Sequence, residues 1–431
     1  MKFYSTNSSK HFVSLQEAVI KGLAPDNGLY MPERIPTFSQ EFINSLSEKS
    51  FREIAFAVAK EFVGEDVSSD QLKNIIDHTI SFDAPLVEVE KNIFALELFH
   101  GPTLAFKDFG ARFMSQMLGH FAKQQNREIV ILVATSGDTG SAVANGFLGV
   151  DGTRVIVLYP KGKVSDIQEK QFTTLGKNIT ALEVNGTFDD CQGLVKQAFL
   201  DQELNKKFFL TSANSINIAR LIPQSFYYFY AWSRLPKNNN VVFSIPSGNF
   251  GNLTAGLIAK RMGLPIQHFI AATNINDIVP HYLITKEFQP RSSASTISNA
   301  MDVGNPSNFA RMLNLFEDDH SKMKNLITGC SFTDEETRDA MKKVFKETNY
   351  TLDPHGAIGY LGLKKYQSQS PETVGVFLET AHPAKFLDVV ESTLQTKVEI
   401  PDGLKFFLSK KKTSISCNAD FNSFKSVLQE I

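Results

Sequence analysis

The feature that most constrains the fold is an alternation, from Glu128 onward, of short apolar runs with segments of helical periodicity. Runs rich in β-branched residues predict strands, and strands that alternate with helices indicate a parallel sheet covered on both faces. The predicted strands are residues 129–134, 155–159, 179–184, 241–245, 269–272 and 374–378. The sequence therefore predicts an α/β fold.

The chain is longer than one hydrophobic core normally supports, which predicts two or three structural units around a shared site. Residues 1–84 have apolar positions at helical spacing, so we expect a mainly helical N-terminal unit. Residues 85–390 form the predicted α/β region, and residues 391–431 a C-terminal extension whose lysines at 410–412 should lie on a solvated surface. The Ser-, Asn- and Pro-rich segment 290–308 is predicted to be a long loop, either a solvated connection or a mobile lid.

Composition excludes several classes of function. The formal charge of -2 gives no reason to expect nucleic acid or an anionic membrane as a partner. No apolar run approaches the roughly 20 residues of a membrane span, and the polar N-terminus lacks the apolar core of a signal peptide. The three cysteines, Cys191, Cys330 and Cys417, are too few and too far apart for a metal cluster or a disulfide framework. We therefore expect a cytoplasmic protein without a metal site.

Small polar residues and glycines follow three of the predicted strands. In an open parallel sheet, ligands bind beyond the carboxyl ends of the strands, where loops lead into helix N-termini with free backbone N–H groups. The loop after 129–134 predicts a carboxylate or phosphate cradle, and the loop after 241–245 is the better phosphate site because its two glycines permit close approach to bound oxygens. The residues concerned are Thr135, Ser136, Gly137, Asp138 and Thr139 in the first loop, Gly248, Asn249, Phe250, Gly251 and Asn252 in the second, and Thr380 in the third.

Each of these loops alone would more often be an ordinary turn. The three loops together favour an anion-binding site. No Gly-x-Gly-x-x-Gly or P-loop signature follows a strand, so dinucleotide and ATP binding lack the motif they require.

Lys107 is the candidate catalytic residue. It is predicted to lie in the first turn of a helix that continues through Phe113, with Thr103 as a possible cap. The positive end of the helix dipole slightly favours the neutral amine, which is the form that attacks an aldehyde. Asp108 and Arg112, four residues apart, are expected to form an ordinary surface pair. Taken alone, a lysine in this setting is more often structural than catalytic.

The segment from His100 to Phe109, His-Gly-Pro-Thr-Leu-Ala-Phe-Lys-Asp-Phe, resembles the cofactor-lysine segment of threonine synthases of the longer, bacterial and fungal type. The resemblance extends over nearly the whole chain. It includes Ala134-Thr-Ser-Gly-Asp-Thr-Gly140, Ser212-Ala-Asn-Ser-Ile-Asn217, Pro246-Ser-Gly-Asn-Phe-Gly251, Ala272-Thr-Asn274, Ser298-Asn-Ala-Met-Asp302 and Thr380-Ala-His-Pro-Ala-Lys-Phe386.

The resemblance implies two parallel-sheet α/β domains with pyridoxal phosphate between them, as in the tryptophan synthase β-like enzymes. It also implies that O-phosphohomoserine and water become threonine and phosphate by β,γ-replacement, in the last step of threonine biosynthesis, in a monomer or small homo-oligomer. Lys107 would form the Schiff base and act as the base, Gly248 to Asn252 would hold the cofactor phosphate, and Thr380 would approach the pyridine nitrogen. The substrate carboxylate would bind at residues 135–139, and the substrate phosphate at Ser215, Asn217 and Arg220.

One departure from the family concerns Asn252, where many relatives have an acidic residue; this puts the detailed contact in doubt but not the activity. His100, His382 and Asp108 could assist proton transfer or could be hydrogen-bonded helix-end residues. Three alternatives remain open. They are a different reaction of the same cofactor, such as serine or threonine dehydration, a non-catalytic phosphate-binding relative, and a nicotinamide dehydrogenase.

Overall fold

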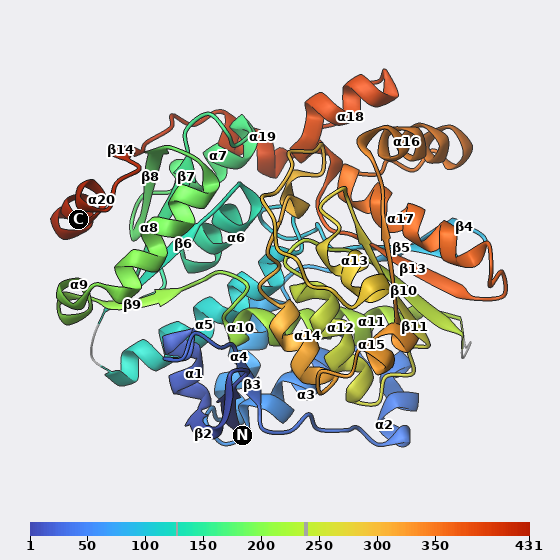
Figure 1. Cartoon of the computed structure of the whole chain (residues 1–431), viewed down its shortest axis with the longest axis horizontal. Helices are drawn as coiled ribbons and strands as arrows, with labels where there is room; N and C mark the ends of the chain where they lie inside the picture. Colours follow the sequence, from blue (N-terminus) through green and yellow to red (C-terminus); the bar gives the residue numbers. More distant parts are fainter. Residues whose placement is uncertain (126–127, 237–239) are drawn as a thin grey trace.

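The structure is a computed structural model that describes residues 1–125, 128–236 and 240–431 (Figure 1). The predicted α/β fold is confirmed, because the chain builds two separate, mainly parallel sheets. The first sheet has five parallel strands in the order β14-β8-β7-β6-β9. Its strands are β6 (Ile129–Ala134), β7 (Thr153–Pro160), β8 (Ile179–Asn185), β9 (Phe209–Ser212) and β14 (Ile415–Asn418).

The second sheet has six strands in the order β12-β11-β10-β13-β5-β4, all parallel except for the edge strand β4. Its strands are β4 (Leu86–Glu90), β5 (Ile93–Glu97), β10 (Val241–Pro246), β11 (His268–Thr273), β12 (Ile327–Ser331) and β13 (Val374–Glu379). Every residue of β6, β10 and β13 is buried, as expected for strands covered on both faces. All six predicted strands are therefore present.

Helices surround both sheets, and Figure 1 shows the two sheets with their helices on either side of a central region. Around the five-stranded sheet lie α6 (Asp138–Phe147), α7 (Asp166–Thr173), α8 (Phe188–Leu200), α9 (Gln202–Lys207) and α20 (Phe421–Glu430). Between and around the sheets are α5 (Lys107–Gln125), α10 (Ile218–Leu221), α11 (Phe226–Arg234), α12 (Gly251–Arg261), α13 (Ile278–Thr285), α14 (Phe309–Leu315), α15 (His320–Leu326), α16 (Asp334–Thr348), α17 (Pro354–Gln367), α18 (Leu387–Leu394) and α19 (Asp402–Leu408). Short 3₁₀ turns occur at Leu46–Glu48, Ile222–Ser225, Asn299–Met301 and Pro383–Phe386.

The N-terminal unit is only partly as predicted. Its helices are α1 (Leu15–Lys21), α2 (Gln40–Ser45), α3 (Phe51–Val63) and α4 (Ser69–Thr79). It also contains an unpredicted antiparallel sheet of β1 (Lys2–Ser5), β2 (Ser8–Ser14) and β3 (Tyr30–Pro32). Strand β2 is mostly exposed and polar, so it lacks the apolar alternation that identifies a strand. The core of this unit is continuous with that of both larger sheets.

The C-terminal extension is part of the fold, because β14 pairs with β8 at the edge of the five-stranded sheet. The lysines at 410–412, which we predicted to lie on a solvated surface, are exposed or partly exposed. Lys412, with 34% of its side chain exposed, also forms ion pairs with Glu169 and Glu183, which the sequence did not predict. Charge pairing across sequence-distant elements leaves no local pattern in the sequence.

The long loop predicted at 290–308 is present between α13 and α14, interrupted by one 3₁₀ turn. Its polar residues are hydrogen-bonded: Asp302 accepts from Asn274 Nδ2 at 2.9 Å and from Thr296 Oγ1 at 2.7 Å, and Asn276 Nδ2 donates to Ala294 O. Among the described residues no helix is both long enough and apolar enough to span a membrane.

Candidate active site

Lys107 is the first residue of α5, so the prediction that it lies in the first turn of a helix is confirmed. The preceding backbone is tied to the end of β13, because Phe106 N donates to Thr380 O at 2.8 Å and Ala105 bridges Ala381. Thr103 is not the cap; its hydroxyl and backbone N–H both donate to the Asp108 carboxylate. The local fold therefore places Lys107 beside the carboxyl end of β13.

Asp108 and Arg112 do not form the predicted surface pair. Asp108 is 1% exposed and bound to Thr103, whereas Arg112 donates to His78 O and to Ser81 Oγ. Helical spacing brings two such residues to neighbouring positions but does not reveal that one of them faces the core.

A cavity opens where the predicted loops of the two sheets meet. It is lined by Lys107 together with Phe106 and Gly110 of the same region, Thr139 after β6, Ser215, Arg220 and Gln224, Pro246 and Gly248 to Asn252 after β10, Ala300 and Met301, His355, and Thr380 after β13. Parallel strands place their carboxyl ends at one edge of a sheet, which brings the loops after β10 and β13 together, and the loop after β6 reaches the same cavity from the other sheet. The sequence reasoning gave no role to Gln224, Ala300, Met301 or His355; Ala300 and Met301 lie in the family segment 298–302, whereas Gln224 and His355 lie in no motif.

The loop after β10 has the form of an anion cradle. Phe250 adopts a left-handed conformation with a φ of 60°, and α12 starts at the next residue, where the first N–H groups have no helical carbonyl partner. Asn249 Oδ1 accepts from the backbone and the hydroxyl of Ser307. A methyl group on Gly248 would lie 2.9 Å from Met301 Cα, so only glycine fits between this loop and its neighbour.

The other side of the cavity contains cations and an unpaired amide oxygen. Arg220 Nη1 donates to Ala213 O at 2.6 Å, while Arg220 Nε has no partner among the described residues. Gln224 Nε2 donates to Arg220 O, which leaves the buried Gln224 Oε1 without a donor. Buried polar atoms without partners are uncommon in folded proteins, so these two mark a place where a polar ligand can bind.

The amine of Lys107 faces this cavity and is otherwise enclosed by protein. The pKa of Lys107 is lowered to about 8, mainly by burial; the Asp138 carboxylate opposes this shift, and the cations Arg220 and Lys385 add to it. A lysine with a pKa this close to neutrality is partly unprotonated in the cell, as a nucleophilic amine must be. It is the chemical group in the cavity best suited to attack a carbonyl.

Not every predicted residue reaches the cavity. Thr135 lies beneath the first loop, where its Oγ1 accepts from Gly137 N and Gly140 N, and only Thr139 of that loop lines the cavity. Gly137 has a φ of 142°, a conformation that favours glycine. Asn217 instead caps α10 and donates to Val19 O. Ser136 is partly buried outside the cavity lining.

His382 and His100 also lie outside the cavity lining. His382 accepts from Ala384 N at the start of a 3₁₀ turn, and His100 pairs with Glu97 at 2.7 Å. Both are hydrogen-bonded, in agreement with the structural alternative considered for them.

Thr380 lines the cavity directly after a buried carboxyl, Glu379, whose oxygens have no donor among the described residues. Burial and the neighbouring Asp353 carboxylate raise the pKa of Glu379 well above its usual range. Asp353 in turn binds His355, with 2.6 Å between Oδ1 and Nδ1, and His355 Nε2 accepts from Ala300 N. Glu379, Asp353 and His355 thus support the segment around Ala300, which packs against Gly248 in the loop after β10.

The raised pKa of Glu379 predicts a stability that falls as pH rises. The folded chain keeps the proton at pH values where the unfolded chain, with a pKa of 4.5, has lost it, so the free energy of unfolding should decrease above that pH by up to about 1.4 kcal/mol per pH unit. Glu379→Gln, which cannot ionise, should match the parent near pH 4.5 and exceed its melting temperature increasingly toward pH 8. The exposed Glu88 on β4 provides the control substitution Glu88→Gln. A melting-temperature difference that is constant across this range would contradict a protonated Glu379.

Comparison with known proteins gives consistent matches over the whole chain. Residues 2–80 match the family model described as threonine synthase N terminus, residues 79–379 that of pyridoxal-phosphate dependent enzymes, and residues 356–428 that of threonine synthase, C-terminal. The threonine synthases of Haemophilus influenzae and Escherichia coli are 46% and 44% identical to this chain, each over 99% of both sequences. The crystal structure of a pyridoxal phosphate-bound threonine synthase from Brucella melitensis has a TM-score of 0.94 at 35% identity, covering 100% of this chain and 99% of that one.

Proposed function

The chain belongs to the threonine synthase family of pyridoxal phosphate-dependent enzymes, and from this premise we propose that its substrate is O-phosphohomoserine, which it converts with water into L-threonine and phosphate. The observation that supports this most strongly is the cavity in which the Lys107 amine faces both an anion cradle and the cation Arg220. A cofactor phosphate and a substrate phosphate require two separate anion sites, and the cavity offers both.

The residues present fit pyridoxal phosphate. The glycine at 248 allows the loop to approach closely, and the start of α12 offers free N–H groups. Among the residues that the structure describes, Lys107 is the only lysine that lines the cavity. We propose that Gly248 to Asn252 hold the cofactor phosphate and that the Thr380 hydroxyl lies next to the pyridine ring. Asn252 Nδ2 already donates to Pro246 O, so its side chain shapes the loop.

When bound, pyridoxal phosphate supplies an electron sink for charge that develops on the substrate. The Lys107 amine would hold the cofactor, and we propose that it takes the proton from Cα of the substrate and moves protons at neighbouring atoms. Arg220 and Ser215 are placed to bind the phosphate that leaves Cγ, and Thr139 with the backbone of its loop to bind the substrate carboxylate. Exclusion of other water by the bound substrate would leave only the molecule that adds at Cβ.

We propose that the chain is divided into three parts. Residues 1–84 act as the N-terminal unit, residues 85–390 as the catalytic region with one subdomain around each sheet, and residues 391–431 as the extension that completes the five-stranded sheet. A cytoplasmic location is supported by the three cysteines, all of which are buried and free of disulfides.

An isotope experiment tests the function. Enzyme loaded with pyridoxal phosphate and given O-phosphohomoserine in ¹⁸O-labelled water should form one threonine and one phosphate per substrate, with the label in the threonine hydroxyl. Labelled oxygen in phosphate, with homoserine as the product, would indicate simple hydrolysis. Formation of a 2-oxo acid from L-serine or L-threonine, without threonine synthesis, would indicate the dehydratase alternative.

A further inference from the structure

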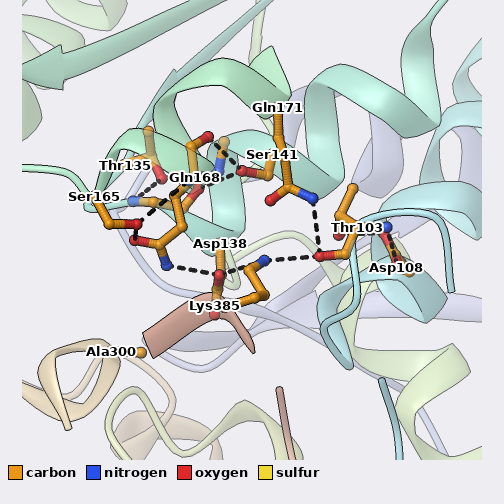
Figure 2. A network of polar contacts seen from close by, with 12 residues as sticks. Thr103, Asp108, Thr135, Asp138, Ser141, Ser165, Gln168, Gln171, Ala300 and Lys385 are labelled. Atoms are coloured by element: carbon orange, nitrogen blue, oxygen red, sulfur yellow. Dashed lines mark hydrogen bonds and ion pairs between the residues drawn. The ribbon is translucent and has the colours of Figure 1, made fainter. Parts of the chain in front are cut away.

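Lys385 is a buried cation outside the cavity lining, on the 3₁₀ turn that follows Thr380. Its side chain is 0% exposed, and its Nζ lies 2.7 Å from Asp138 Oδ1 and 2.8 Å from Thr103 O. Figure 2 shows Lys385 between these two partners, with Gln168 bonded to Asp138 and Gln171 to Thr103. Burying a lysine costs free energy unless it is paired and hydrogen-bonded, and here both conditions are met.

The three groups come from three parts of the fold. Lys385 follows the strand β13 of the six-stranded sheet, Asp138 begins α6 on the five-stranded sheet, and Thr103 precedes the helix of Lys107. The contact therefore joins the two sheets at the point where the catalytic helix begins. Asp138 is also one of the five loop residues, 135–139, that we predicted to bind substrate, but its Oδ1 is bound by Lys385 and Gln168.

Three charged side chains act on the Lys107 amine. Asp138 attracts its proton, whereas Arg220 and Lys385 repel it. Burial raises the pKa of Asp138, but Lys385 and Lys107 together lower it below its usual range, so this carboxylate is ionised. His355 lines the same cavity, and Asp108, next to Lys107 in sequence, is bound to Thr103.

We propose that Asp138 and Lys385 are positioning residues for Lys107: they hold the loop after β6 against the backbone that leads into α5, and their opposite charges cancel at its amine. The inference rests on the proposed role of Lys107. Removing one partner leaves the other charge unbalanced beside the amine, and the two removals have opposite signs.

The test measures how the Lys107 amine titrates in the full-length chain without added cofactor. Trace labelling with acetic anhydride at a series of pH values, followed by mass spectrometry of the Lys107 peptide, gives the pH midpoint of its reactivity. Lys385→Met leaves Asp138 unopposed and should raise the midpoint by about 1 unit or more. Asp138→Asn leaves Lys385 unopposed and should lower it. The double variant should return the midpoint toward that of the parent.

Lys425→Met is the matched control, because Lys425 forms a 2.8 Å ion pair with Asp201 at the C-terminal edge of the molecule; its midpoint should equal that of the parent. Single-variant shifts in the same direction, or no shift, would overturn the proposal, since a purely structural role predicts no reversal of sign. If Lys385→Met does not fold, the midpoint of Asp138→Asn must still fall. Threonine formation by the parent is assayed separately, so a failure of the proposed function is distinguishable from a failure of this inference.

Discussion

Lys107→Ala is expected to reduce threonine formation from O-phosphohomoserine by at least about 1000-fold, because the variant lacks both the amine that binds the cofactor and the base that moves protons. Among the residues that line the cavity, no other side chain is an amine. The kcat measured with saturating substrate and added pyridoxal phosphate reports the loss. Borohydride reduction of the parent should attach the cofactor to the peptide that contains residue 107, and mass spectrometry should find no such adduct in the variant.

The control is Lys123→Ala, on the same helix, whose side chain is 70% exposed and pairs only loosely with Asp151. It should retain the parent's kcat and its adduct at residue 107. An adduct on another lysine of the Lys107→Ala chain, together with appreciable activity, would show that the catalytic amine has been assigned to the wrong residue.

The features that could be predicted from the sequence are those determined by local pattern. Strands 129–134, 241–245 and 374–378 lie within fully buried strands, where apolar residues predominate. Their loops converge because parallel strands end at one edge, so the approximate location of the site followed from the strands. The family motif then identified Lys107, which local pattern alone would have left as an ordinary lysine.

The features that could not be predicted depend on contacts between distant segments. Strand β14 is mostly exposed and short, and it becomes a strand only by pairing with β8, more than 200 residues earlier. Gln224 reaches the cavity from a 3₁₀ turn without any motif. Lys385 was recognised as part of a family segment, but its pairing with Asp138 requires both sheets to be in place. Nothing in the sequence near residue 138 indicates that its carboxylate is already paired with a cation.

Arg311 illustrates how much of the site depends on such a distant contact. Its side chain is 0% exposed and donates five hydrogen bonds, to the carbonyls of Tyr30, Ser215 and Ile216 and to Asn308 Oδ1. Burial without a carboxylate partner lowers its pKa to about 9. Ser215 lines the cavity, and Asn308 N donates to Asn249 O in the proposed phosphate loop. One guanidinium thus connects the N-terminal unit to both sides of the site.

Arg311→Met should therefore lower the free energy of unfolding by about 3 to 5 kcal/mol, because Tyr30 O, Ile216 O and Asn308 Oδ1 lose the hydrogen bonds that Arg311 donates and each unsatisfied group costs about 1 to 3 kcal/mol, not fully additively. Arg311→Lys should lose most of the same free energy of unfolding, since an ammonium cannot reproduce the planar fork of the guanidinium.

The exposed Arg34 provides the control, and the stability of Arg34→Met should stay within about 0.5 kcal/mol of that of the parent. Denaturant unfolding measures the stabilities, and equilibrium dialysis against pyridoxal phosphate should show weaker binding by Arg311→Met, because Asn308 and Asn249 then lose their support. Unchanged stability with weakened binding would show that Arg311 supports the cofactor site but not the fold. Unchanged stability together with unchanged binding would show that Arg311 supports neither.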